Sequence, residues 1–294
     1  MNSTFLGFFP IKKLENVKER KSVLLFGLPI ERIKDTPGGS RKAPDALREQ
    51  SLEFSGISSN FNISENKFNY FDIGNINPLK EKERIRQIWQ KKKELDIRLL
   101  VLGGDHSITY DTLSQAPWNE KTAVIWIDAH ADLADEYPPN IFYSHGTVFT
   151  NLKNDNNLVG NQMLLIGGHA YTQTKEEFYK LRNKEVSFIP THQFFENKEE
   201  SMKTIQEFVK DKKRVFLSLD VDSMDQTYVP TLGTAEPFGL TPYLLVDILK
   251  LILPKTSYVD IVETQFEKTN KIALNFVVGL IFKILEIWEI NDIG

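Results

Sequence analysis

The stretch "TAVIWIDAHADLADEY" (residues 122–137) begins as an apolar run and then places Asp128, His130 and Asp132 at every second position. A continuous apolar run is typical of a strand that is buried on both faces, as in a parallel sheet covered by helices. Side chains two residues apart in an extended chain point the same way, so Asp128 and His130 can converge on one point. Asp132 follows where the strand gives way to a loop, and we expect it to bend back toward them. The stretch therefore predicts a central strand that ends in a polar site.

Seven further apolar runs of the same character are spread along the chain, and most are separated by segments with helical periodicity. The runs are "SVLLFG" (22–27), "FNYFDIG" (68–74), "IRLLVLGG" (97–104), "MLLIGG" (163–168), "VSFIP" (186–190), "RVFLSLDVD" (214–222) and "SYVDIVE" (257–263). The expected helices cover residues 78–95, 172–183, 198–213 and 241–253. In the last of these, Thr241 is a candidate N-cap and Pro242 suits the first helical position. The alternation predicts a three-layer α/β/α fold, and we expect residues 1–294 to form a single domain.

Composition excludes several classes of function. The 294 residues carry a net charge of −4 and show no basic patch interleaved with aromatic residues, so nucleic acid is not an expected partner. Cysteine is absent, which excludes disulfides, thiolate-bound metals and a cysteine nucleophile. The apolar stretch 272–288 is interrupted by Asn275, Lys283 and Glu286 and is too short to span a bilayer comfortably. We expect it to be a final amphipathic helix packed on the core of a cytoplasmic protein, without a membrane partner.

Two other apolar runs end in metal-ligating residue types, as the first one does. "VLGGDHS" (101–107) supplies His106, and "LSLDVDSMD" (217–225) supplies Asp220 and Asp222, which can also converge if the chain is extended. Ligands of open parallel sheets bind beyond the carboxyl ends of the strands. An apolar strand needs none of these groups for its own stability. The three strand ends therefore predict one shared site.

Four carboxylates in one pocket repel each other unless cations neutralise them. Two divalent cations resolve that conflict, and six oxygen and imidazole ligands suit two metals better than one. The set has no sulfur, which favours Mn(II), with Fe, Co or Ni possible, over structural zinc. Such ions acidify water at neutral pH, so no serine or cysteine nucleophile is required. Alone, a DxD pattern is often a turn and a single histidine is often structural. The prediction depends on the combination of His106, Asp128, His130, Asp132, Asp220 and Asp222.

These motifs resemble the signature blocks of the ureohydrolase family, which comprises arginases, agmatinases and formiminoglutamases. The matching blocks, in the family's order, are "GGDHSIT" (103–109), "DAHAD" (128–132) and "SLDVDSMD" (218–225). Weaker matches are "GGSRKAPDALRE" (38–49), "GTAEPFGLT" (233–241) and "DIVE" (260–263). The resemblance implies an eight-stranded parallel sheet flanked by helices, a centre of two manganese ions, and hydrolysis of a guanidino or amidine C–N bond.

The resemblance also implies a role for each matching residue. His106 and Asp132 would bind the first metal, His130 and Asp222 the second, and Asp128 and Asp220 would bridge the two. His145, in "YSHGTVF" (143–149), would shuttle protons to the leaving amine, which suits an imidazole that titrates near neutrality. A histidine that only shapes a turn is the alternative. Glu263 would bind the cationic guanidinium of the substrate, and its alternative is a structural ion pair with a nearby Lys or Arg.

The segment "DLADEYPPNIFYSHGTVF" (132–149) is most similar to agmatinases and lacks the arginase Ser-Gly-Asn-x-His-Gly pattern. The implied reaction is the conversion of agmatine to putrescine and urea. Four positions depart from the family pattern, and among them Phe238 could narrow the pocket; the others are Gln226, Thr231 and Ala235. His169 and His192 receive no role. Asp105 and Asp225 could support the ligands or form turns.

Other functions stay open on the sequence. The same chemistry could act on formiminoglutamate, guanidinobutyrate, another guanidino acid or guanidine. A non-catalytic family member would be expected to lose ligands, and this chain keeps the full set. A single-zinc deacetylase of related topology would not need all six residues. The family usually forms trimers or hexamers, so we expect a homo-oligomer that acts on a small-molecule substrate.

Overall fold

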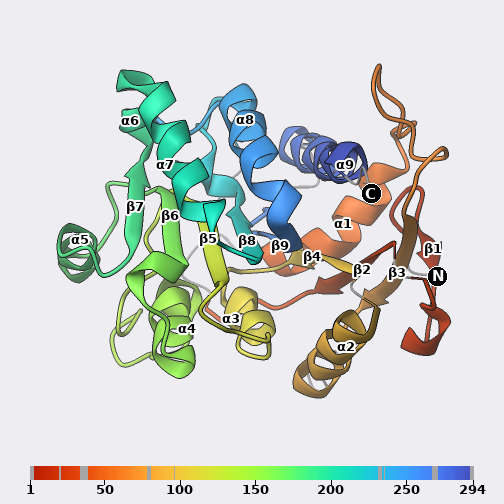
Figure 1. The fold of residues 1–294 in the computed structure, drawn as a ribbon, viewed down its shortest axis with the longest axis horizontal. Coiled ribbons are helices and arrows are strands. Elements are labelled where there is room, and N and C mark those ends of the chain that lie inside the picture. Colours follow the sequence, from red (N-terminus) through yellow and green to blue (C-terminus); the bar gives the residue numbers. More distant parts are fainter. Residues whose placement is uncertain are drawn as a thin grey trace.

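Nine parallel strands form the central sheet of the described chain (Figure 1). The computed structural model describes residues 3–19, 21–33, 39–77, 81–95, 97–230, 234, 236–266 and 271–291. The strand order in the sheet is β1-β3-β2-β4-β9-β8-β5-β6-β7. The strands are β1 (Phe9–Pro10), β2 (Ser22–Leu28), β3 (Asn69–Asn75), β4 (Arg98–Gly103), β5 (Thr122–Asp128), β6 (Met163–Gly167), β7 (Ser187–Pro190), β8 (Arg214–Asp220) and β9 (Thr256–Val262).

All eight apolar runs are strands, which confirms the predicted α/β/α fold with its parallel sheet. The family resemblance implied eight strands, whereas the sheet has nine. The additional strand is β1, a two-residue strand at the edge of the sheet. Both residues of β1 are exposed, and Pro10 has no N–H group to donate. The pairing with β3 includes a hydrogen bond from Ile11 N to Asp72 O at 2.9 Å. So short a strand leaves no periodic signal in the sequence.

Helices cover both faces of the sheet (Figure 1). Along β5, Ile125 and Ile127 face one core, and Val124 and Trp126 face the other. The first core lies under α1 (Ala43–Ser51), α6 (Thr191–Glu196), α7 (Lys198–Lys210), α8 (Pro242–Ile252) and α9 (Ile272–Asn291). The second lies under α2 (Glu81–Leu95), α3 (Ser107–Leu113) and α4 (Val148–Asn156), with α5 (Lys175–Arg182) packed at its border. Short 3₁₀ helices are η1 (Leu14–Asn16), η2 (Ser40–Lys42), η4 (His145–Thr147), η5 (Gly160–Gln162), η6 (Val221–Ser223) and η7 (Leu253–Lys255).

The expected helix signals hold where the structure describes them. Thr241 caps α8, because its side chain accepts a hydrogen bond from Leu244 N at 3.3 Å, and Pro242 is the first helical residue. The predicted C-terminal helix is α9. Within the described ranges, no helix has the length and apolarity needed to cross a bilayer.

The order of the strands places the site. Strands β4, β9, β8 and β5 are neighbours in the sheet. Because the strands are parallel, their carboxyl ends meet at one edge. His106 follows β4 and Glu263 follows β9, whereas Asp220 ends β8 and Asp128 ends β5. The polar residues at the carboxyl ends of four adjacent strands therefore lie together at one edge of the sheet.

Candidate metal centre

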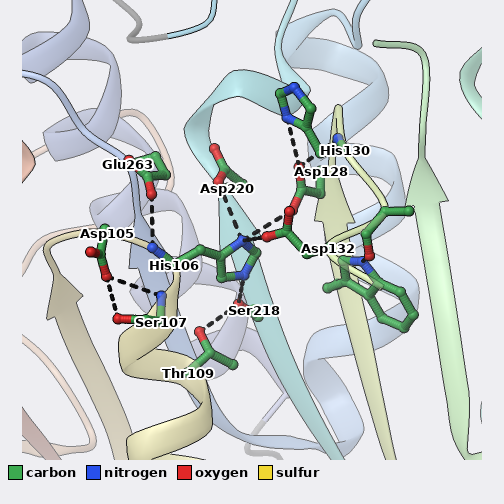
Figure 2. Close-up of polar contacts among 12 residues, drawn as sticks. Asp105, His106, Ser107, Thr109, Asp128, His130, Asp132, Ser218, Asp220 and Glu263 are labelled. Atoms are coloured by element: carbon green, nitrogen blue, oxygen red, sulfur yellow. Dashed lines mark hydrogen bonds and ion pairs between the residues drawn. The ribbon is translucent and has the colours of Figure 1, made fainter. Parts of the chain in front are cut away.

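Three carboxylates surround the Nδ1 atom of His106 (Figure 2). His106 Nδ1 lies 3.0 Å from Asp128 Oδ2, 2.9 Å from Asp132 Oδ2 and 3.4 Å from Asp220 Oδ2. All four side chains are buried. Asp132 reaches this position because its backbone turns into the left-handed region, with φ of 52°. The predicted return of Asp132 toward the strand end is confirmed.

A second group surrounds His130. Its Nδ1 lies 2.9 Å from Asp222 Oδ2 and 3.7 Å from Asp128 Oδ1. The expectation that Asp220 and Asp222 point to one spot on an extended chain is wrong in detail, because residues 221–223 form η6. Asp222 N donates to Asp220 Oδ1 at 2.8 Å, and the two side chains face different histidines. Asp128 contributes one oxygen to each group.

The hydroxyls beyond the two histidines fix which ring nitrogen is protonated. Ser218 donates its hydroxyl proton to Asp260 Oδ1 at 2.6 Å, so its oxygen accepts from His106 Nε2 at 2.8 Å. Thr172 donates to Glu236 Oε1 at 3.0 Å, so its oxygen accepts from His130 Nε2 at 3.0 Å. In the neutral rings, both Nδ1 atoms therefore carry a lone pair. Metal-binding histidines typically donate their other ring N–H group to an acceptor that orients the ring, as both rings do here.

This arrangement fits metal ions. A lone pair on His106 Nδ1 that faces three carboxylates is repelled unless a cation lies between them. His106 Nδ1 and Asp128 Oδ2 are both buried and lack a hydrogen-bond partner of suitable geometry. Within the described residues, His106, Asp128 and Asp132 form one group whose donor atoms could hold an ion, and Asp128, His130 and Asp222 form another. Asp220 is adjacent to the first group through His106.

We expect replacement of Thr172 by valine to weaken Mn²⁺ binding by roughly 10- to 100-fold, because His130 loses the hydroxyl that orients its ring. The measurement is a calorimetric titration with Mn²⁺. Thr204→Val serves as the control, since the Thr204 hydroxyl is exposed on α7 and donates to the backbone oxygen of Glu200. Equal affinity of the Thr172→Val and wild-type proteins would show that the hydroxyl does not orient the ligand.

Without metal, protons compete for the site. Burial and the Asp128 carboxylate raise the pKa of Asp132 from 3.8 to about 6. Burial alone would lower the pKa of His106, but the Asp128, Asp132 and Asp220 carboxylates hold it well above 6.5. Metal must displace these protons, so its binding releases them and is stronger at higher pH.

The same shifts predict a pH-dependent effect of metal on stability. Folded metal-free protein binds more protons at Asp132 than the unfolded chain does between pH 3.8 and about 6, so its stability falls as pH rises through that range. The contribution of His106 is present below 6.5 and is lost as pH rises through its elevated pKa in the folded protein. We expect the gap between the melting temperatures of Mn²⁺-loaded and chelator-treated protein to widen from about pH 5 to 8. A gap that is constant or narrows would contradict this coupling.

Helix α5 anchors the loop that carries Asp132. Glu177 accepts a hydrogen bond from Leu133 N at 3.1 Å, and Lys180 Nζ donates to Leu133 O at 2.7 Å. Glu177 also accepts from Thr174 N and Thr174 Oγ1, which forms a capping box at the start of the helix. These contacts hold Asp132 in its left-handed conformation.

A cavity of about 230 Å³ opens over the two groups. His145 and Glu263, the two residues to which the resemblance assigns catalytic roles, both line it. The ring of Tyr137 packs edge-on against His145 at 5.4 Å between ring centroids. An added Cβ at Gly146 would lie 2.9 Å from the same ring, which explains why glycine follows His145. The lining acids are Glu31, Asp105, Asp132, Glu177, Asp220, Asp222 and Glu263.

Glu263 follows β9 in a left-handed conformation, with φ of 57°, and its Oε1 accepts from His106 N at 2.8 Å. Among the described ion pairs, none joins Glu263 to a lysine or arginine, so its alternative role as a structural ion pair has no support there. Burial and the Asp105 carboxylate raise the pKa of Glu263 well above 4.5. A cation bound beside Glu263 would lower this pKa and favour the ionised carboxylate.

Asp105 and Asp225, the two other aspartates near the site, both accept hydrogen bonds from the backbone of nearby turns. Asp105 accepts from Ser107 N at 3.1 Å and so supports the turn at His106. Asp225 forms a turn, because it accepts from Thr227 N and Phe238 N.

Phe238 is 68% exposed and is absent from the described lining, so it does not narrow the cavity there. His169 bonds Thr191, and His192 lies exposed on α6. Gln226 lies at the surface side of the Asp225 turn, also outside the described lining. Thr231 and Ala235 lie outside the described residues.

Comparison with known proteins identifies the class. The model of the arginase family matches residues 21–285. The chain is 25% identical over 260 residues to N(1)-aminopropylagmatine ureohydrolase of Thermococcus kodakarensis, with 85% of each chain covered. It is 28% identical over 271 residues to a formimidoylglutamase of Bacillus subtilis, with 83% of this chain and 80% of the relative covered. Agmatine ureohydrolase of Thermoplasma volcanium has a similar structure, with a TM-score of 0.80 at 25% identity over 96% of this chain and 95% of the other.

The fold and the paired His–Asp groups define an arginase-like α/β protein with a site able to hold metal. The protein belongs to the arginase family, because the family match covers most of the chain. The resemblance to ureohydrolases is therefore confirmed. The relatives are named for different substrates, so the choice of substrate depends on the cavity itself.

Proposed function

We propose that this protein is a binuclear manganese hydrolase that cleaves a C–N bond of a linear guanidino compound, with agmatine as substrate and putrescine and urea as products. In this proposal, residues 1–294 form one catalytic domain. His106 and Asp132 would hold one ion and His130 and Asp222 the other, with Asp128 and Asp220 between them. Fe, Co or Ni would suit the same donors. When bound, the ions supply an acidified water as nucleophile and stabilise developing negative charge.

The charge of the cavity is the observation that carries the choice of substrate. Seven acidic residues line it, and the described lining contains neither lysine nor arginine. Two divalent ions would offset the four ligand carboxylates. The lining would still contain four further acidic residues, Glu31, Asp105, Glu177 and Glu263. A substrate with two cationic groups and no carboxylate is complementary to such a cavity. Agmatine meets this description, whereas guanidinobutyrate and formiminoglutamate bring carboxylates that would need cationic partners.

The chain's own residues would then orient the substrate and move protons. Glu263 is held by His106 N and would accept hydrogen bonds from the guanidinium, which places the reacting carbon beside the metal groups. His145 lines the same cavity and would donate a proton to the departing amine. The ring of Tyr137 against His145 limits the directions in which the imidazole can point.

A substrate screen tests the proposal. Protein loaded with Mn²⁺ is assayed for urea, ammonia and formamide with agmatine, arginine, guanidinobutyrate, guanidine and formiminoglutamate. We expect agmatine to give the highest kcat/KM, by roughly 5- to 150-fold over the carboxylate-bearing compounds, because an unpaired carboxylate costs about 1–3 kcal/mol. Formamide released from formiminoglutamate at a higher rate would identify a formiminoglutamase instead. No turnover of any compound would contradict the proposal.

A further inference from the structure

We infer that Arg32 and Tyr143 are positioning residues that hold the loop of His145 against the loop of His106. The inference rests on the role in catalysis proposed for His145. Arg32 belongs to none of the matched segments, and Tyr143 lies in the segment of His145 without a role assigned from the sequence. Neither lies in the described lining of the cavity. Both lie in a separate polar cluster beside the site, defined as Arg32, Asp111 and Tyr143.

One side of Arg32 is bonded to the His106 loop. Its backbone nitrogen donates to Asp105 Oδ2, and its Nη1 donates to Ser107 Oγ at 2.6 Å. Asp105 Oδ1 accepts from Ser107 N at 3.1 Å. The two residues that flank His106 are therefore joined to each other and to Arg32. Movement of the guanidinium would be passed to the histidine between them.

The other side of Arg32 is bonded toward the His145 loop. Nη2 lies 2.8 Å from Asp111 Oδ2, and the guanidinium carbon lies 4.5 Å from the centroid of the Tyr143 ring. The Tyr143 hydroxyl donates to Asp111 Oδ1. Tyr143 is thus held both over its ring face and at its hydroxyl. Tyr143 is two residues before His145, so the position of Tyr143 determines where η4 begins.

The segment after Tyr143 is stiff enough to transmit that constraint. Ser144 N donates to Thr147 Oγ1 at 2.9 Å, and residues 145–147 form η4. Ala134 N also donates to Gly146 O at 3.1 Å. A shift at Tyr143 would therefore displace His145 as part of one turn. Misplacement of a catalytic group by about 1 Å can reduce the rate by about 100-fold.

An arginine at position 32 suits these contacts, which reach the His106 loop on one side and Asp111 and Tyr143 on the other. The planar guanidinium donates in several fixed directions and stacks on an aromatic face, and a lysine ammonium cannot do both. The Asp111 side chain is 2% exposed and that of Arg32 is 21% exposed, so the pair is largely withdrawn from water. Such buried pairs add little net stability, because desolvation offsets their attraction. A role in geometry explains the pair better than a role in stability does.

The test is a double-mutant cycle that uses Tyr143→Phe and His145→Ala with agmatine as substrate. Tyr143→Phe keeps the ring under Arg32 and removes the hydroxyl bonded to Asp111. We expect kcat to fall roughly 10- to 100-fold with KM and bound Mn²⁺ unchanged. In the His145→Ala background the same change should alter kcat by less than about twofold, because no imidazole remains to be positioned. Tyr110→Phe is the matched control, since it removes a neighbouring hydroxyl that bonds Asp155, and it should leave kcat unchanged.

An equal reduction by Tyr143→Phe in both backgrounds, or no reduction in either, would overturn the inference. Arg32→Lys gives an independent arm, with the same loss expected only when His145 is present. If wild-type protein hydrolyses no amidine, the proposed function fails, and amide hydrogen exchange over residues 141–149 then decides the positioning role. Faster exchange in Tyr143→Phe than in Tyr110→Phe would support it, and equal exchange would overturn it.

Discussion

Replacing Asp128 with alanine is expected to abolish hydrolysis and to remove both metal ions. Asp128 Oδ2 lies 3.0 Å from His106 Nδ1, and Oδ1 lies 3.7 Å from His130 Nδ1, so one carboxylate belongs to both groups. Its loss takes a donor from each group and lowers the negative charge that holds the ions. Metal content is measured by elemental analysis after dialysis, alongside urea release.

The control for this variant is Asp247→Ala. Asp247 lies on α8 and pairs with Lys198 and Lys250 at the surface, so its loss should leave metal content and activity unchanged. Circular dichroism checks that the Asp128→Ala protein keeps its fold, because the change also removes the hydrogen bond from His130 N to Asp128 Oδ1. An Asp128→Ala protein that keeps two ions and full turnover would refute the assignment.

Replacing Glu263 with glutamine is expected to lower kcat/KM for agmatine by roughly 30- to several-thousand-fold. The range corresponds to about 2–5 kcal/mol for loss of one partner from a buried charged pair. Glutamine keeps an oxygen that can accept from His106 N, so the metal groups should stay in place. Steady-state kinetics and metal content are measured on the same preparation.

Glu207→Gln is the matched control for Glu263→Gln, because Glu207 is exposed on α7 and pairs with Lys210 at 3.7 Å. Unchanged kcat/KM in Glu263→Gln would show that this carboxylate does not bind the guanidinium. Loss of metal in that variant would instead assign Glu263 a structural role beside His106.

The strands could be predicted from the sequence because burial on both faces leaves continuous apolar runs. β5 and β2 are buried along their whole length, and both were recognisable. β1 was not, since two exposed residues carry no such signal. The order of the strands also escaped prediction. It depends on which apolar faces pack together, and no local spacing records that β9 lies between β4 and β8.

The two candidate metal-binding groups could be predicted because their residue types follow strand ends at short spacing. The supporting contacts could not. Ser218 opens the matched block 218–225 but has no role that its spacing reveals, and Thr172 lies outside the matched blocks. Their roles arise only when the fold places them beside His106 and His130. The extended-chain assumption failed at Asp222, because the chain turns into a 3₁₀ helix directly after Asp220.

The most direct test of a binuclear centre is anomalous diffraction at the manganese edge from crystals of the Mn²⁺-loaded protein. We expect two peaks. One should lie between His106, Asp128 and Asp132, and the other between Asp128, His130 and Asp222. A single peak, or peaks away from these side chains, would contradict a binuclear centre at this edge of the sheet.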